Sequence, residues 1–121
     1  VEASDTDLPV ISLQDYHFEL PDGLGNGPVT VRNDGAVVHE LVIGRLADGA
    51  TVQDLIHFET EGKTPPAPYT MVTGTTFIDP GREGRLDLDL EPGEYVAICF
   101  LPSPNGEAHY ELGMVHPFTV A

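Results

Sequence analysis

Short apolar runs separated by glycine, proline and other turn-forming residues make up most of the chain. Runs of this length, with alternating or β-branched apolar positions, predict strands rather than helices. Many short strands in one chain are typical of a β-sandwich or barrel, so the sequence predicts an all-β fold. The predicted strands cover residues 10–20, 29–31, 37–46, 75–78, 86–90, 95–100 and 118–120.

Two of these runs also indicate how their strands are buried. Within residues 86–90, leucine alternates with aspartate, so one face of the strand is apolar and the other is acidic. Residues 95–100 carry little polarity, which predicts a central strand covered on both faces. Between residues 29–31 and 37–46, the sequence Asn33-Asp34-Gly35 predicts a tight hairpin turn that joins those two strands.

One segment departs from the strand pattern. Thr51 and Asp54 have the spacing of a capping box, which marks the start of a helix. Apolar positions between residues 52 and 59 then fall on one helical face. Gly62 and the proline-rich residues 65–68 end the helix. We therefore expect one short helix, in an insertion between strands.

The length of 121 residues suits a single domain that folds around one core without disulfide bonds. The polar start of the chain predicts a flexible N-terminal stub over residues 1–8, followed by one domain over residues 9–121. No signal peptide and no apolar run long enough to span a membrane is visible in the sequence.

The charge of the chain is strongly one-sided. Twenty acidic residues face five lysines and arginines, which gives a formal net charge of −15. Nucleic acid is a poor partner for such a chain, because phosphate binding requires a basic patch. An acidic surface keeps a protein dissolved and attracts basic partners. A solvated surface without a specific partner explains the same composition, so both interpretations stay open.

Cys99 is the single cysteine of the chain. An intramolecular disulfide is therefore excluded, and so is a structural zinc site built on several cysteines. A lone cysteine is a small buried apolar residue, a reactive thiol or a metal ligand. The residues that accompany Cys99 in the sequence are therefore needed to distinguish among these three roles.

Four residues form a candidate metal site: His39, Cys99, His109 and Met114. Two imidazoles, one thiolate and a weak axial thioether are the ligands of a mononuclear blue-copper centre, and this set serves both Cu⁺ and Cu²⁺. The last three residues lie on one loop in the pattern C-x9-H-x4-M, whereas His39 lies far upstream on a predicted strand. Taken singly, each residue is more often part of the core than a ligand, so the prediction depends on the joint pattern.

Two alternatives use the same residues differently. His116 lies two positions after Met114, and residues two apart in a strand share a face, so His116 is a rival ligand. Cys99 could also pair with His39 or His109 as a catalytic thiolate. No helix N-terminus is predicted beside Cys99 to lower its pKa, so we expect no enzyme.

The segments around these residues resemble the cupredoxin family. The similar pieces are residues 29–35 leading to 38–43, residues 90–99 with Pro-Gly-x-Tyr before the cysteine, and residues 109–114. The resemblance implies a Greek-key β-sandwich or barrel, in which Tyr95 locks a turn through a hydrogen bond. It also implies that His39, Cys99 and His109 are equatorial copper ligands and that Met114 is the axial one.

The chain departs from the family pattern at two places. Plastocyanin-like and azurin-like members commonly have asparagine after the upstream ligand histidine, where this chain has Glu40, so the hydrogen bonds around the site are expected to differ. The loop from Cys99 to His109 is longer than in the small carriers and is closer to the type-1 domain of copper nitrite reductases. The resemblance further implies that His109 lies at the solvent edge, within an apolar patch that includes Leu112.

The hypothesis from the sequence is a soluble, monomeric, extracytoplasmic blue copper protein that carries single electrons. By resemblance it is periplasmic, secreted or tethered at the cell surface, without membrane insertion of the domain. Its partner would be a redox protein, for which the acidic surface favours a basic one. Two other functions stay open: copper storage or delivery without electron transfer, and a metal-free sandwich that serves as a binding module.

Overall fold

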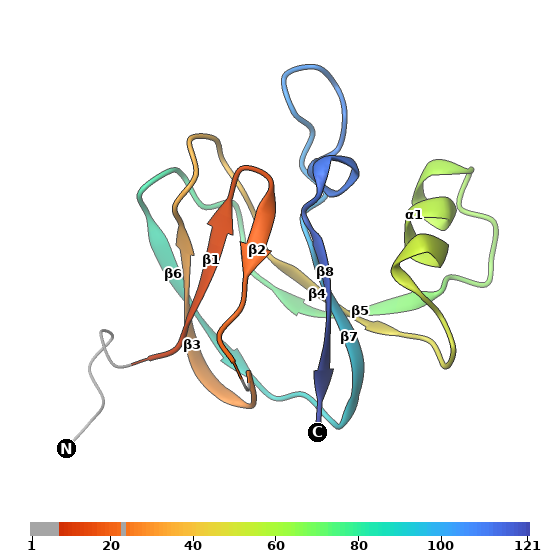
Figure 1. The fold of residues 1–121 in the computed structure, drawn as a ribbon, viewed down its shortest axis with the longest axis horizontal. Coiled ribbons are helices and arrows are strands. Elements are labelled where there is room, and N and C mark those ends of the chain that lie inside the picture. Colours follow the sequence, from red (N-terminus) through yellow and green to blue (C-terminus); the bar gives the residue numbers. More distant parts are fainter. Residues whose placement is uncertain (1–7, 23) are drawn as a thin grey trace.

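A computed structural model describes residues 8–22 and 24–121 of the chain, and the predicted stub lies outside it apart from Leu8. The described residues form two four-stranded β-sheets and one α-helix (Figure 1). The strands are β1 (Val10–Gln14), β2 (His17–Glu19), β3 (Gly27–Asn33), β4 (Val42–Leu46), β5 (Tyr69–Gly74), β6 (Glu83–Leu88), β7 (Gly93–Ile98) and β8 (Val115–Val120). The helix is α1 (Val52–Thr60), and a short 3₁₀ helix, η2 (His109–Leu112), lies between β7 and β8.

The two sheets pack face to face around a shared core. The first sheet has the order β2-β1-β3-β6, in which β1 and β3 run parallel and the other pairs antiparallel. The second sheet has the order β5-β4-β7-β8 and is antiparallel throughout. The prediction of an all-β sandwich with one short helix is therefore confirmed.

Strand β7 is covered on both faces, as its apolar sequence predicts. Tyr95 and Ala97 belong to the core between the sheets. Val96 and Ile98 point the other way, into a second apolar cluster with the fully buried Leu55 of α1. The helix thus covers the outer face of the second sheet. It begins with the predicted capping box, in which Thr51 and Asp54 each accept the backbone N–H of the other.

The predicted hairpin between residues 29–31 and 37–46 is wrong. Strand β3 pairs with β1 and β6, while β4 lies in the other sheet. The reason is Asn33, which is fully buried and donates from Nδ2 to the backbone oxygens of Val37 and Ile78, both at 2.8 Å. These bonds hold the segment as a crossover between the sheets, so a turn-forming sequence here does not produce a hairpin.

Two strand boundaries also differ from the prediction. His39 is not part of β4 and forms an isolated bridge with Ile78. The strand expected over residues 75–78 is replaced by β5, which pairs with β4 and lies at the edge of the second sheet. As an edge strand β5 exposes Met71 and Val72, so it lacks the inward apolar alternation on which the prediction relied.

The loop between β7 and β8 lies at one end of the sandwich. In Figure 1 this loop, with η2, is at the same end as the turn between β1 and β2. Tyr95 closes the turn that precedes β7, because its hydroxyl donates to the backbone oxygen of Glu91 at 2.6 Å. The prediction of a locked turn before the cysteine is thereby confirmed.

Candidate metal centre

Three of the four predicted ligands converge inside the protein. His39, Cys99 and His109 each offer one donor atom, and these atoms lie within 4.8 Å of one another. The two Nδ1 atoms are 3.2 Å apart, and Cys99 Sγ is 3.4 Å from His109 Nδ1. The exposed fractions are 0% for His39 and Cys99 and 1% for His109. Two imidazoles and a thiol therefore face one another away from water.

Backbone hydrogen bonds hold the loop that carries Cys99 and His109. The N–H of Cys99 donates to the backbone oxygen of Met114 at 3.2 Å, and the N–H of Met114 donates to that of His109 at 3.0 Å. The N–H of His109 donates to the backbone oxygen of Leu101 at 2.8 Å. The loop thus folds back on itself, so residues ten positions apart present their side chains to one point.

His39 reaches the same point from a different segment. Its backbone exchanges two hydrogen bonds with Ile78, of 3.1 and 2.8 Å. Its Nε2 lies 2.7 Å from Asp15 Oδ1. Because a carboxylate accepts hydrogen bonds, we assign the proton of the neutral ring to Nε2. The lone pair of Nδ1 then faces Cys99 and His109, in the orientation that a metal ligand needs.

Asp15 is a site residue that the sequence analysis missed. Partial burial acts to raise the pKa of Asp15, but hydrogen bonds from the Ala36 backbone, from His39 and from the Val37 backbone outweigh it and lower the pKa. No pattern in the neighbouring sequence indicates a role for Asp15 at the site, because it lies in the turn after β1, 24 positions from His39. Only the paired strands bring the two residues together.

The two other donors have shifted pKa values. Burial raises the pKa of the Cys99 thiol, whereas hydrogen bonds from the backbone amides of Glu40 and Leu101 act to lower it. Burial lowers the pKa of His109, and the neighbouring His39 acts in the same direction. His109 is therefore held as a neutral imidazole, which is the form that binds metal ions.

Glu40 replaces the asparagine expected after the upstream histidine. Its Oε1 accepts the backbone N–H of Phe100 at 3.3 Å. The side chain thus connects the segment of His39 to the residue that follows Cys99. A glutamate side chain therefore links the two ligand-bearing segments at this position.

Met114 and His116 are placed very differently. Met114 is fully buried and belongs to the same core cluster as Cys99, so its role as the axial ligand stays a prediction. His116 is exposed on β8 and lies outside the group of three donors. It lines a surface hollow with residues such as Asp22 and Phe118. The alternative of His116 as a ligand is therefore not supported.

His109 does not reach the solvent edge that the resemblance implies. The ring of Tyr16 packs against it with a centroid distance of 4.9 Å, and Leu112, which was expected beside it, is 37% exposed. Gly113 brings the loop close to this turn, since a Cβ at its φ of 124° would lie 2.8 Å from the backbone oxygen of Tyr16. The turn after β1 therefore covers His109.

The donor set fits copper better than catalysis. A trigonal arrangement of two imidazole nitrogens and one thiolate, with a thioether nearby, is the ligand set of type-1 copper. Cys99 and His109 are also close enough to form a thiolate–imidazole pair. However, both are buried and burial raises the pKa of the thiol, whereas a catalytic cysteine is an accessible thiolate.

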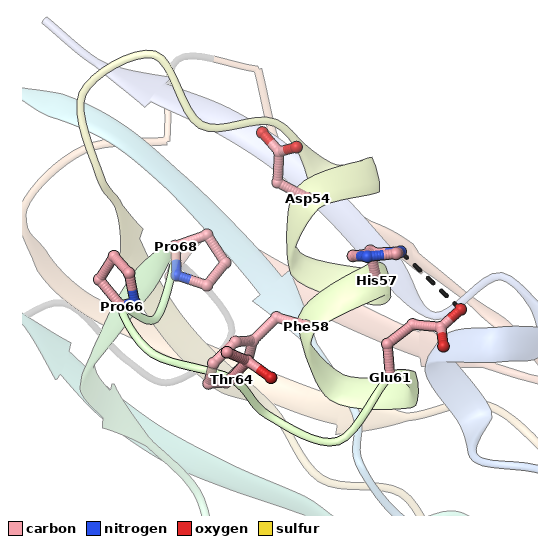
Figure 2. Close-up of a pocket in the computed structure, with 7 residues that line it drawn as sticks. All are labelled: Asp54, His57, Phe58, Glu61, Thr64, Pro66 and Pro68. Atoms are coloured by element: carbon pink, nitrogen blue, oxygen red, sulfur yellow. Dashed lines mark ion pairs between the residues drawn. The ribbon is translucent and has the colours of Figure 1, made fainter.

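A separate hollow of about 210 Å³ lies on the surface beside α1 (Figure 2). It contains none of the three donors, and its charged rim includes an ion pair of 3.9 Å between His57 and Glu61. Its lining residues are Asp54, His57, Phe58, Glu61, Thr64, Pro66 and Pro68. The hollow is thus independent of the candidate metal centre.

Comparison with solved structures finds the same fold in known proteins. Auracyanin from the photosynthetic bacterium Roseiflexus castenholzii, reduced with dithionite, superimposes with a TM-score of 0.57 at 25% identity, covering 93% of this chain and 94% of that one. Auracyanin A from Chloroflexus aurantiacus, described as a "blue" copper protein, gives 0.56 at 17% identity, covering 93% and 96%. Auracyanin B gives 0.53 at 19% identity, covering 100% and 93%.

Sequence comparisons add no relatives. No protein-family model matches the chain, and no curated protein matches it. The likeness to known proteins therefore lies in the fold, and the buried histidine-cysteine-histidine group is an observation on this chain.

Proposed function

We propose that this chain, a member of the cupredoxin family by its fold and its buried histidine-cysteine-histidine group, binds one copper ion and carries single electrons. The observation that carries the proposal is the convergence of His39 Nδ1, His109 Nδ1 and Cys99 Sγ within 4.8 Å. The copper-protein neighbours of the same fold support it. Copper would supply a centre that accepts and releases one electron.

The proposed ligands are the three converging residues and Met114. His39 and His109 would bind through Nδ1, Cys99 through its thiolate, and Met114 as the weak axial ligand. The hydrogen bonds from the Glu40 and Leu101 amides are directed at the sulfur, which favours the thiolate. Protein residues thus provide the donors and also stabilise the charge on the sulfur.

Rigid placement of the donors suits electron transfer. Each donor is held by a backbone bridge or by the core, and none is open to water. A frame that keeps its geometry in both oxidation states lowers the reorganisation that accompanies each transfer. The same burial keeps water and external thiols away from the thiolate. Storage or delivery, in which the metal has to leave, has no comparable support in this geometry.

We also propose an extracytoplasmic site of action and a basic redox partner. Thiol reductants of the cytosol would compete with a Cu²⁺–thiolate centre, which favours an oxidising compartment. The net charge of −15 would speed the approach of a basic partner and make association depend on salt. Among the described residues, no helix has the length and apolar character to cross a membrane.

The test is addition of Cu²⁺ to the purified full chain, followed by absorption and electron paramagnetic resonance spectra. We expect intense visible absorption and narrow copper hyperfine splitting. Cys99→Ser and His109→Gln should abolish the absorption, whereas the control His116→Gln should keep it, because His116 lies outside the donor group. Colourless binding of Cu⁺ alone would favour storage. Absence of binding, with an unchanged melting temperature, would refute the proposal.

A further inference from the structure

We infer that Asp15 is a positioning residue of the centre: its carboxylate orients His39 and makes a bound copper ion harder to reduce. The inference rests on the proposed function. Its basis is the contact of 2.7 Å between Asp15 Oδ1 and His39 Nε2, on the side of the ring opposite to the metal-facing Nδ1.

Both oxygens of this carboxylate have defined partners. Oδ1 faces His39, and Oδ2 accepts the backbone N–H of Ala36 at 2.9 Å. The Asp15 side chain is 28% exposed, whereas that of His39 is 0% exposed. One end of the pair is therefore accessible to water, and the other is fixed inside the protein. This arrangement sets the rotation of the carboxylate and, through it, the plane of the imidazole.

Gly35 leaves the space that this contact occupies. A Cβ at this position would lie 2.9 Å from His39 Nε2 and closer still to Asp15 Oδ1. Gly35 itself is held by Asn33, whose Oδ1 accepts its N–H at 2.8 Å. The crossover that the sequence analysis took for a hairpin turn therefore forms one wall around the aspartate–histidine pair.

The carboxylate has two consequences for the metal. First, it requires a proton on Nε2 of the neutral ring, which leaves Nδ1 free to bind. Second, a negative charge beside a ligand favours the more positive metal ion, so Cu²⁺ is stabilised relative to Cu⁺. Loss of a carboxylate that supports a ligand typically costs 10- to 100-fold in metal affinity, on the order of what we expect here for Cu²⁺.

Asp34 provides a matched comparison. It lies at the same end of the first sheet, but its carboxylate contacts Arg32 at 2.8 Å and the hydroxyl of Ser12 rather than a ligand. Asp34→Asn therefore removes one negative charge from this end of the protein without touching His39. Asp15→Asn removes one charge and keeps an oxygen that accepts from Nε2. Asp15→Leu removes both the charge and the acceptor.

The first measurement needs no copper. Nitrogen-15 NMR of the metal-free full chain reports which ring nitrogen of His39 carries the proton. We expect the proton on Nε2 in the wild type and in Asp15→Asn, and loss of this preference in Asp15→Leu. A proton on Nδ1 of His39 in the wild type would overturn the inference.

The second measurement is the reduction potential of the copper-loaded proteins. In Asp15→Asn we expect affinity for Cu²⁺ to fall at least tenfold relative to Cu⁺, which raises the potential by about 59 mV or more. Asp34→Asn should leave it nearly unchanged. An equal rise in both variants, or none in Asp15→Asn, would overturn the inference. A colourless wild type would refute the proposed function and the effect on the potential, while the NMR result would still decide the orientation of His39.

Discussion

Asn33 makes three side-chain hydrogen bonds to backbone groups beside the candidate metal centre, and its removal tests how the fold supports the site. Its Nδ2 donates to the backbone oxygens of Val37 and Ile78, and its Oδ1 accepts the N–H of Gly35, each at 2.8 Å. Ile78 in turn forms the bridge that places His39. We therefore expect Asn33→Ala to weaken both the fold and the position of one ligand.

The expected magnitude follows from the three hydrogen bonds. Each contributes a net of about 1 kcal/mol to folding, and of their backbone partners Ile78 is buried while Gly35 and Val37 are partly buried. The free energy of unfolding of the metal-free protein should therefore fall by about 3 kcal/mol. For a domain of this size the slope in urea is about 2 kcal/mol per M, so the unfolding midpoint should fall by about 1.5 M.

Urea unfolding followed by circular dichroism, at one fixed salt concentration, measures this loss. The control is Asn26→Ala, because Asn26 also bonds a backbone segment through both side-chain atoms, to Leu90 at 2.9 and 2.6 Å. The Asn26 side chain is exposed and makes two such bonds rather than three, so the loss should be smaller. Copper affinity should fall in Asn33→Ala and remain in Asn26→Ala. Equal losses of stability in the two variants would refute the argument.

Three further substitutions test individual contacts of the fold. Gly113→Ala puts a Cβ 2.8 Å from the backbone oxygen of Tyr16. The free energy of unfolding in urea should therefore fall by about 1–3 kcal/mol, and copper titration should show weaker binding. Leu55→Ala should lower the free energy of unfolding in urea by about 2–5 kcal/mol. The visible spectrum of the copper form should stay the same, and a changed spectrum would contradict the separation of the two apolar clusters. Hydrogen bonds from Arg32 and Ser12 lower the pKa of Asp34 below 3.8, so its stabilisation is present above that pH and is lost as the pH falls through the folded pKa. Unfolding curves of the wild type and Asp34→Asn should therefore differ at pH 7 and converge in acid, and a difference that persists in acid would count against this origin.

The parts of the site that the sequence predicts are those with local or family patterns. Cys99 and His109 lie on one loop in a recognisable spacing, and the apolar strand before them fixes where the loop begins. The helix was predicted for a similar reason, because the Thr51–Asp54 capping box is formed within four residues. Local hydrogen bonds and periodicity are visible in a sequence without knowledge of the sheet order.

The parts that the sequence does not predict depend on contacts between distant segments. Asp15 reaches His39 because β1 and β3 run side by side, and no spacing in the sequence indicates that pairing. Asn33 has the turn propensity of a hairpin residue, but its buried amide instead donates to the backbone oxygens of Val37 nearby and of the distant Ile78. The edge strand β5 was missed because exposed apolar residues such as Met71 break the expected alternation.

The metal centre and the fold share the same hydrogen bonds, so their energies should be coupled. His39 is held by Ile78, Cys99 by Met114 and His109 by Leu101, and an unfolded chain does not present these three donors together. A ligand that binds only the folded state stabilises it by about 4.1 kcal/mol at 1,000 times its Kd. Copper should therefore raise the urea midpoint of the wild type. In Asn33→Ala the copper-induced increase of the urea midpoint should be smaller, because part of the free energy of copper binding is used to re-form the bridge between His39 and Ile78. An equal increase in both proteins would show that this bridge does not position the ligand.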